Sequence, residues 1–138
     1  MRFFHHPTIS RIAWAAFRII VGLAFARHGA QKLFGVFGGL DGNGATVPFM
    51  SLFGLAGVLE LVGGLLVAIG LFTRPVAFLL SGEMAVAYFM VHARQGSLIP
   101  IVNKGEPAVL YCFAFLLLAF HGAGAYSVDE SRERTVVP

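Results

Sequence analysis

The stretch FARHGAQKLFG, at the end of the first apolar segment, combines a histidine, a glutamine and a lysine. His28, Gln31 and Lys32 follow i, i+3, i+4 spacing, which places them on one face of a helix. Helices that run alternately up and down would bring polar residues of later segments to the same end of the fold. These later residues are His92, Asn103, Glu106 and Tyr111. The sequence therefore predicts one polar binding site, built from the ends of three helices.

Three interpretations of this cluster remain open. Hydrogen-bond donors beside apolar surface suit a quinone headgroup, so quinone is one candidate ligand. Two histidines on different helices could also be axial ligands of a haem, but nothing else in the sequence marks a haem site. The third interpretation is a helix-end cluster of interfacial and snorkelling side chains. We predict no metal site, because no histidine, cysteine or carboxylate spacing supports one.

Three ionisable residues lie deep within apolar segments: Arg18, Glu60 and Glu83. Each is about eight residues, or about 12 Å, from the start of its predicted helix, near the middle of a hydrocarbon core about 30 Å thick. One unpaired charge at that depth costs about 2.5–3.5 kcal/mol. We therefore predict an intramembrane ion network in which Arg18 pairs with one or both carboxylates. The network either sets the helix register or lines a path for a proton or ligand.

The composition indicates that lipid surrounds the chain. Of the 138 residues, 57% are hydrophobic and 12% are charged, about half the charged fraction of a typical soluble domain. A water-soluble chain of this length could not bury so many apolar side chains, so we predict a lipid bilayer as partner. The basic residues form no run, so we predict no nucleic-acid partner. A single cysteine, Cys112, excludes an internal disulfide and a CxxC motif.

Four apolar segments are separated by glycine, proline and charged residues, and each has about the length that a helix needs to cross hydrocarbon. Strand-like alternation is absent, and a helix satisfies its own backbone in lipid. We predict an all-α fold, an integral membrane four-helix bundle with antiparallel neighbours. The expected helices are residues 10–34, 52–72, 75–93 and 104–122, in one transmembrane domain of residues 1–126 followed by a polar C-terminal tail of residues 127–138.

Four crossings place both termini on one side of the membrane. The basic residues expected on that side are Arg2, Arg11, Arg74, Arg132 and Arg134. Those expected on the other side are Lys32, Arg94, Lys104 and a snorkelling Arg27. The larger number on the first side favours both termini in the cytoplasm.

Several stretches carry a resemblance to a known family. They are Arg18 followed by GLAFARHGAQKLFG, then LAGVLELVGGLLVAIGLFTRPVA, AYFMVH and NKGEPAVLYCFAFLLLAFHGAGAYSVD. Together they resemble the DoxX family of small four-helix membrane proteins of bacteria and archaea, which implies a multi-pass protein of the cell membrane. The resemblance places at motif positions Arg18, His28, Lys32, Glu60, Gly63, Arg74, Asn103, Glu106 and Tyr111.

The family takes its name from a subunit of a quinone-linked sulfur-oxidising complex, and other members are linked to membrane oxidoreductases and thiol stress. The resemblance thus implies a membrane subunit or anchor of a quinone-linked oxidoreductase system. The sequence carries no self-sufficient catalytic motif, so we expect no intrinsic cofactor and a redox role that requires quinone or a redox protein partner. Two alternatives stay open. One is a small-molecule or proton carrier that uses the Arg18, Glu60 and Glu83 network, and the other is a purely structural assembly partner or homo-oligomer.

Overall fold

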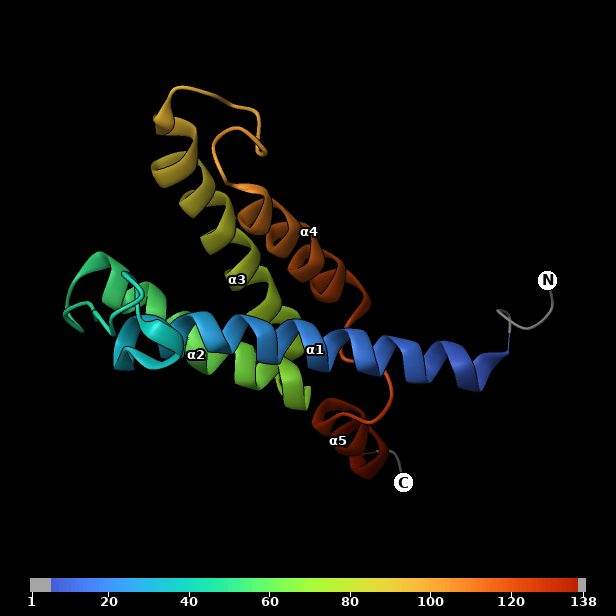
Figure 1. The fold of residues 1–138 in the computed structure, drawn as a ribbon. Helices are drawn as coiled ribbons and strands as arrows, with labels where there is room; N and C mark the ends of the chain where they lie inside the picture. Colours follow the sequence, from blue (N-terminus) through green and yellow to red (C-terminus); the bar gives the residue numbers. More distant parts are fainter. Residues whose placement is uncertain (1–5, 137–138) are drawn as a thin grey trace.

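The computed structural model describes residues 6–136, and helices dominate these residues (Figure 1). The elements are α1 (Pro7–Phe34), η2 (Val36–Gly38), α2 (Leu52–Ile69), α3 (Thr73–Ala87), η3 (Tyr88–His92), η4 (Ala93–Gln95), α4 (Glu106–His121) and α5 (Val128–Val136). Within residues 6–136 there is no strand, only an isolated bridge between Gly39 and Ala45. The predicted all-α fold is therefore confirmed. Arg2, used above to predict the orientation, lies outside the described residues.

The first helix begins earlier than predicted, at Pro7 rather than at residue 10. Proline suits a first helical turn because the N–H that it lacks would have no intrahelical acceptor there. The 28 residues of α1 make it about 42 Å long. The helix ends at Gly35, whose left-handed backbone (φ 68°) allows its N–H to donate to the carbonyl of Gln31.

The other three predicted helices are present, with their ends displaced by a few residues. The Ser51 hydroxyl caps the start of α2, and Gly70 ends it in the left-handed conformation. The third helix begins at Thr73, and a π-helical turn (η3) and a 3₁₀ turn (η4) continue it to Gln95. The fourth begins at Glu106 rather than at residue 104. The apolar periodicity thus located the helices, whereas local capping decided their ends.

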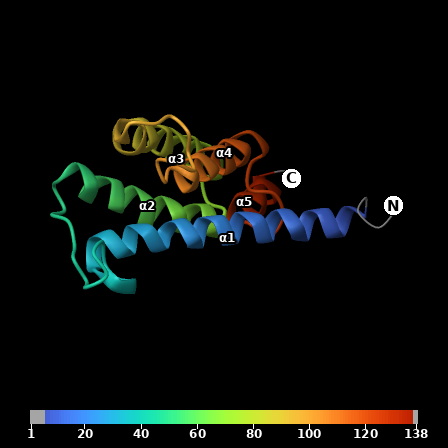
Figure 2. The same ribbon diagram turned by 45° about the horizontal axis from the view of Figure 1, so that its top comes forward.

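Helices α1 and α2 form one antiparallel pair, packed through small residues (Figure 2). An ideal Cβ on Gly22 would lie 2.6 Å from both the backbone nitrogen of Ala68 and the carbonyl oxygen of Gly64. A Cβ on Gly64 would meet the backbone of Gly22 and Ala26 equally closely. Small residues let membrane helices approach until their backbones touch, and this packing replaces the missing hydrophobic driving force.

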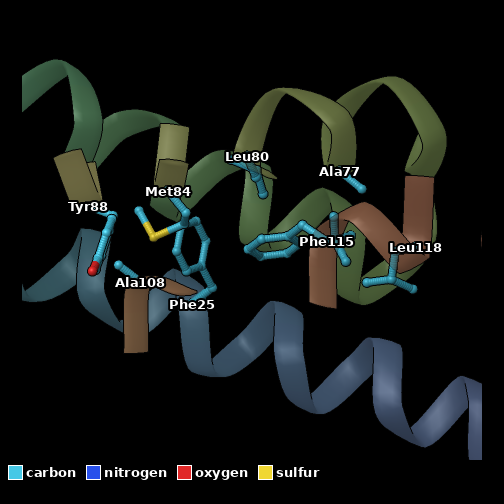
Figure 3. Close-up of a cluster of buried hydrophobic side chains, with 9 residues drawn as sticks. Phe25, Ala77, Leu80, Met84, Tyr88, Ala108, Phe115 and Leu118 are labelled. Atoms are coloured by element: carbon cyan, nitrogen blue, oxygen red, sulfur yellow. The ribbon is translucent and has the colours of Figure 1, made fainter. Parts of the chain in front are cut away.

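Helices α3 and α4 form a second antiparallel pair, held by larger side chains. Leu80 of α3 and Phe115 and Leu118 of α4 are fully buried. Phe25 of α1 reaches into the same core and meets Phe115 edge to face, with ring centroids 4.7 Å apart. Figure 3 shows how these side chains lie together with Ala77, Met84, Tyr88 and Ala108. The core therefore joins the second pair to the first.

The two pairs are inclined to each other. Figure 1 shows that they meet near the α2–α3 connection and α5, and that their opposite ends lie apart. We call the end with the α2–α3 connection the near face, and the end with the connections at residues 35–51 and 96–105 the far face. The predicted bundle is therefore two antiparallel pairs, joined most closely at the near face.

Residues 122–136, which we call the C-terminal clasp, cross the near face. Both carboxylate oxygens of Asp129 accept hydrogen bonds, from the backbone N–H groups of Phe72 and Thr73 at 2.9 Å each. The first N–H groups of a helix have no intrahelical acceptor. Asp129 therefore caps α3 from a distant part of the chain.

Within the clasp, the expected polar tail contains a helix, α5. The Ser127 hydroxyl accepts a hydrogen bond from the N–H of Glu130 at 3.1 Å, and the Glu130 carboxylate accepts one from the N–H of Tyr126 at 2.9 Å. This reciprocal arrangement resembles a capping box. The sequence SVDE carried that signal, so the polar composition of the tail did not exclude a helix.

The outer surface of the helices suits hydrocarbon. Three stretches of the described residues are long and apolar enough to cross a membrane, namely Pro7–Phe34, Leu52–Ile69 and Thr73–Gln95. The apolar α4, with 16 residues, is about 24 Å long. Large exposed apolar side chains occur on every one of these helices and include Ile20, Leu55, Phe78, Leu110 and Phe120. Arg11 of α1 donates to Glu130 of α5 at 3.0 Å, so both described ends of the chain lie at the near face.

The glycine contacts predict that adding one methyl group lowers the free energy of unfolding at some glycines and not at others. Gly22→Ala should lower the free energy of unfolding by about 1–3 kcal/mol, because the new Cβ meets backbone that cannot move aside cheaply. Unfolding in detergent, followed by circular dichroism, measures this cost. The matched control is Gly82→Ala on α3, where a Cβ meets nothing within 4 Å, and it should be neutral or stabilising by up to about 1 kcal/mol. Equal effects at the two glycines would contradict the close α1–α2 contact.

Asp129 predicts a pH dependence of stability. Burial raises the pKa of Asp129, but hydrogen bonds from Thr73 and Phe72 and the charge of Arg132 together bring that pKa below its usual value. A lowered pKa means that the stabilisation is complete above the ordinary aspartate pKa and is lost as the pH falls through the folded-state pKa.

Asp129→Ala should therefore cost about 0.5–2 kcal/mol of unfolding free energy at neutral pH, the range of a helix cap. The difference from wild type should shrink towards zero in acid, as measured by unfolding in detergent at a series of pH values. Glu133→Ala, at an exposed position of the same helix, is the control. A difference that does not change with pH would show that Asp129 does not act through its charge.

Candidate functional site

An ion pair joins α1 to α2 within the membrane-spanning region. Lys32 Nζ donates to Oε1 of Glu60. The Glu60 side chain is only 3% exposed and that of Lys32 is 22% exposed. Burying a carboxylate costs several kcal/mol, which a counter-charge offsets only with good geometry and further hydrogen bonds. The other carboxylate oxygen of Glu60, Oε2, is buried and has no hydrogen-bond partner within residues 6–136.

Glu83 of α3 lies close to this pair. Both of its carboxylate oxygens are buried, and neither has a hydrogen-bond partner among the residues that the structure describes. Leu80 of α3 lies against Gly63 of α2, where an added Cβ would be 2.8 Å from the Leu80 side chain. In this antiparallel pair, Glu60 and Glu83 are each three residues from that contact toward the far face, so they lie at one level. Three ionisable side chains from three helices therefore share one region, and we call Lys32, Glu60 and Glu83 the polar centre. Three of its four carboxylate oxygens lack a donor.

The predicted pairing of Arg18 with Glu60 or Glu83 is wrong. Arg18 is buried, with 1% exposure, but it donates to carbonyl oxygens of the C-terminal clasp. The distances from its guanidinium are 2.7 Å to Ala123, 3.4 Å to Ala125 and 2.8 Å to Tyr126.

The reason lies in the depth of Arg18. A Cβ on Gly70, at the near-face end of α2, would be 2.9 Å from the Arg18 guanidinium. Glu60 lies ten residues before Gly70 along α2, which places it about 15 Å further from the near face. The prediction counted depth from the start of α1, but α1 extends beyond the helix pairs on the near side (Figure 1). Arg18 is therefore a structural clamp of the near face and not part of the polar centre.

The seven-residue polar site predicted at the far face is divided among different contacts. Gln31 Nε2 donates to the carbonyl of Gly39 at 2.8 Å and holds the connection after α1. Lys32 belongs to the polar centre. His92 Nδ1 lies 3.1 Å from the carbonyl oxygen of Asn103. The division follows from the inclination of the helix pairs, which separates the far end of α1 from the far end of α3.

Asn103 organises the connection between α3 and α4. Its amide nitrogen donates to the carbonyl of Ser97 at 2.9 Å and to the Tyr88 hydroxyl at 3.3 Å, and its amide oxygen accepts from the N–H of Gly105 at 2.8 Å. The Tyr88 hydroxyl donates in turn to the carbonyl of Leu98 at 2.6 Å. Asn103 is 2% exposed, so it shapes the loop and offers no donor to a ligand.

His28 and Tyr111 remain together at the α1–α4 contact. Their rings meet edge to face with centroids 5.9 Å apart. Tyr111 is supported from behind by Phe25 and Phe115, at centroid distances of 4.9 and 6.0 Å. Within residues 6–136, neither the Tyr111 hydroxyl nor the His28 ring has a hydrogen-bond partner. Both are therefore able to bond a ligand.

A groove of about 420 Å³ runs beside Tyr111, and we call it the α1–α4 groove. Its lining residues are Val21, Glu106, Pro107, Leu110, Tyr111 and Ala114. Most of this lining is apolar, with Glu106 and the tyrosine hydroxyl as its polar groups. An amphipathic ligand with a hydrogen-bonding head and an apolar tail matches that distribution.

The link between Lys32 and Glu60 was missed because the sequence assigned them to different clusters. The signal that connects them is the glycine spacing, since Gly29 and Gly57 meet across the α1–α2 contact. Side chains on a helix lean toward its N-terminus. In an antiparallel pair Lys32 therefore leans toward the near face and Glu60 toward the far face, so the two side chains converge.

The chain is similar to a known family of membrane proteins along most of its length. A sequence profile described as DoxX matches residues 13–93. An uncharacterized protein of Haemophilus influenzae is 48% identical over 119 residues, covering 84% of this chain and 87% of that protein. The inner membrane protein YphA of Escherichia coli is 29% identical and covers 94% of this chain and 97% of its own. The Escherichia coli inner membrane protein YqjF is 30% identical, with 82% and 86% coverage. No solved structure matches.

Proposed function

Because this bacterial membrane protein belongs to the DoxX family, we propose that it is a membrane subunit or anchor of a quinone-linked oxidoreductase system. The observation that carries the proposal is the α1–α4 groove. Its lining is largely apolar, Tyr111 borders it with a hydroxyl, and the His28 imidazole meets Tyr111 edge to face. A lipid-soluble quinone has the complementary form, a polar head on an apolar tail.

The groove offers a place for each part of a quinone. The quinone carbonyl oxygens accept hydrogen bonds, which the Tyr111 hydroxyl and a His28 ring N–H donate. The isoprenoid tail lies along Val21 and Leu110, and Leu110 is 70% exposed on the lipid-facing side of α4. Because that side chain already faces hydrocarbon, its contact with the tail contributes van der Waals packing and not a hydrophobic driving force.

The electrons come from a partner, since the chain carries no redox motif of its own. We place both termini, and with them the C-terminal clasp, in the cytoplasm. The exposed arginines nearer the near face outnumber the exposed cations nearer the far face. The former are Arg11, Arg74, Arg132 and Arg134, and the latter are Arg27, Arg94 and Lys104. A soluble redox protein that copurifies with the chain from native membranes supports the subunit role. A chain that oxidises or reduces quinone alone contradicts it.

The groove predicts which side chains control quinone affinity. Tyr111→Phe and His28→Ala should each weaken binding of a short-chain benzoquinone about fivefold to tenfold, because each removes one hydrogen bond worth about 1 kcal/mol. Equilibrium dialysis against the protein in detergent micelles measures the affinity.

Tyr126→Phe is the matched control, because Tyr126 lies in the clasp at the near face, remote from the groove, with its side chain exposed. It should bind the quinone as wild type does. If all three variants bind equally well, quinone does not occupy the groove and the proposal is wrong.

A second candidate function, carriage of a proton or small solute, is favoured by the polar centre. Ionisable side chains inside a membrane often line a path for protons or ions. The protein reconstituted in liposomes with a pH-sensitive dye tests this candidate. Glu60→Gln and Glu83→Gln should each abolish any flux, and a flux that neither substitution changes would reject the carrier.

A further inference from the structure

The charges of the polar centre do not balance. Lys32 contributes one positive charge, and Glu60 and Glu83 contribute two negative charges when ionised. Among residues 6–136, no second cation forms an ion pair with these carboxylates. Arg18 is held by the clasp, and Arg27 is exposed, with its charge acting on His28 and Tyr111. From α4 only the uncharged Tyr111 faces Glu60. A net charge of minus one in a low-dielectric region is costly unless something neutralises it.

The unpaired atoms point to the same conclusion independently. Glu60 Oε2 and both oxygens of Glu83 are buried without a hydrogen-bond partner within residues 6–136. Only 3% of the Glu60 side chain is exposed to solvent. Buried carboxylate oxygens in native proteins are normally satisfied, so three such oxygens together indicate a missing partner that brings positive charge.

We infer that the polar centre binds one monovalent hard cation, a proton or an alkali ion such as Na⁺, between Glu60 and Glu83. Carboxylate oxygens are hard ligands and do not select soft metals. The charge deficit of one favours a monovalent over a divalent ion. Lys32 holds Glu60 through Oε1 and so leaves Oε2 to face the cation. The charge of Lys32 also acts on His28, whose imidazole is a further group that can take up a proton.

This inference shares its site, the polar centre, with the second candidate function. It does not require transport, because a cation can bind without crossing the membrane. Binding without flux in liposomes would keep the inference and reject the carrier. Flux without cation binding at Glu83 would overturn the inference and leave the carrier in place.

Infrared difference spectroscopy of the purified protein in lipid nanodiscs tests the inference, because protonated and ionised carboxyl groups absorb at different frequencies. In one arm the pH is stepped at constant choline chloride, within a range well above the usual carboxyl pKa of about 4, so that the exposed carboxylates stay ionised. In the other arm NaCl replaces choline chloride at constant pH. A signal in the first arm identifies a proton, and a signal in the second identifies Na⁺. An imidazole signal in place of a carboxyl signal, lost in His28→Ala, would assign the proton to His28 and overturn the inference.

The single positive and two negative charges of the polar centre predict a different signal for each variant. Wild type should show the signal of one carboxyl group. Glu83→Gln and Glu60→Gln should each abolish it, because Lys32 then balances the remaining carboxylate. Lys32→Gln should about double it, because two carboxylates are left without a cation.

Two further variants keep the result interpretable. Glu133→Gln, at an exposed carboxylate of the clasp outside both the polar centre and the groove, should retain the wild-type signal. Glu83→Asp retains the carboxyl group and should retain the signal even if Glu83→Gln does not fold. No carboxyl signal in either arm, or the same signal in wild type, Glu60→Gln and Glu83→Gln, would overturn the inference.

Discussion

The need to pair every polar group in a region without water is the constraint on which this structure depends. In hydrocarbon no solvent molecule can replace a lost hydrogen bond. Arg18 shows the consequence most clearly, since its buried guanidinium reaches three backbone carbonyls more than one hundred residues away in the chain. The segment after α4 must therefore return across the near face. That return also places Asp129 on the start of α3 and so connects the two helix pairs at one end.

The two helix pairs are stabilised by different kinds of contact. Gly22 and Gly64 allow α1 and α2 to touch backbone to backbone, whereas α3 and α4 pack through Leu80, Phe115 and Leu118. Phe25 is the large side chain of α1 that joins the second core. The clasp covers the near face, and the opposite ends of the two helix pairs lie apart. A site built from both pairs is therefore expected between these ends, where the pairs contact each other. The polar centre and the α1–α4 groove both lie in that region.

The exceptions to the pairing rule are the features that suggest function. Among the described residues, the near face leaves only Arg18 Nε and the Thr73 hydroxyl without a partner, whereas the polar centre leaves three of four carboxylate oxygens without one. The charge of Glu60 also acts on Tyr111, which borders the groove. A quinone takes up protons when it is reduced, so a cation site of the polar centre next to a quinone groove is chemically coherent. The two proposals nevertheless depend on different residues and can fail separately.

The sequence alone determined the helical class, the approximate helix positions, the lipid environment and the family, because these follow from apolar periodicity, composition and local motifs. Gly35, Ser51 and Pro7 set helix ends through local backbone preferences, which a sequence displays directly. The partners of ionisable groups were decided only by the tertiary structure. Arg18 was expected beside Glu60 or Glu83, but α1 extends beyond the helix pairs on the near side, so Arg18 lies at the near face. The lean of antiparallel side chains brings Lys32 to Glu60 instead. Depth and register between helices arise from packing of the whole chain, and no single segment encodes them.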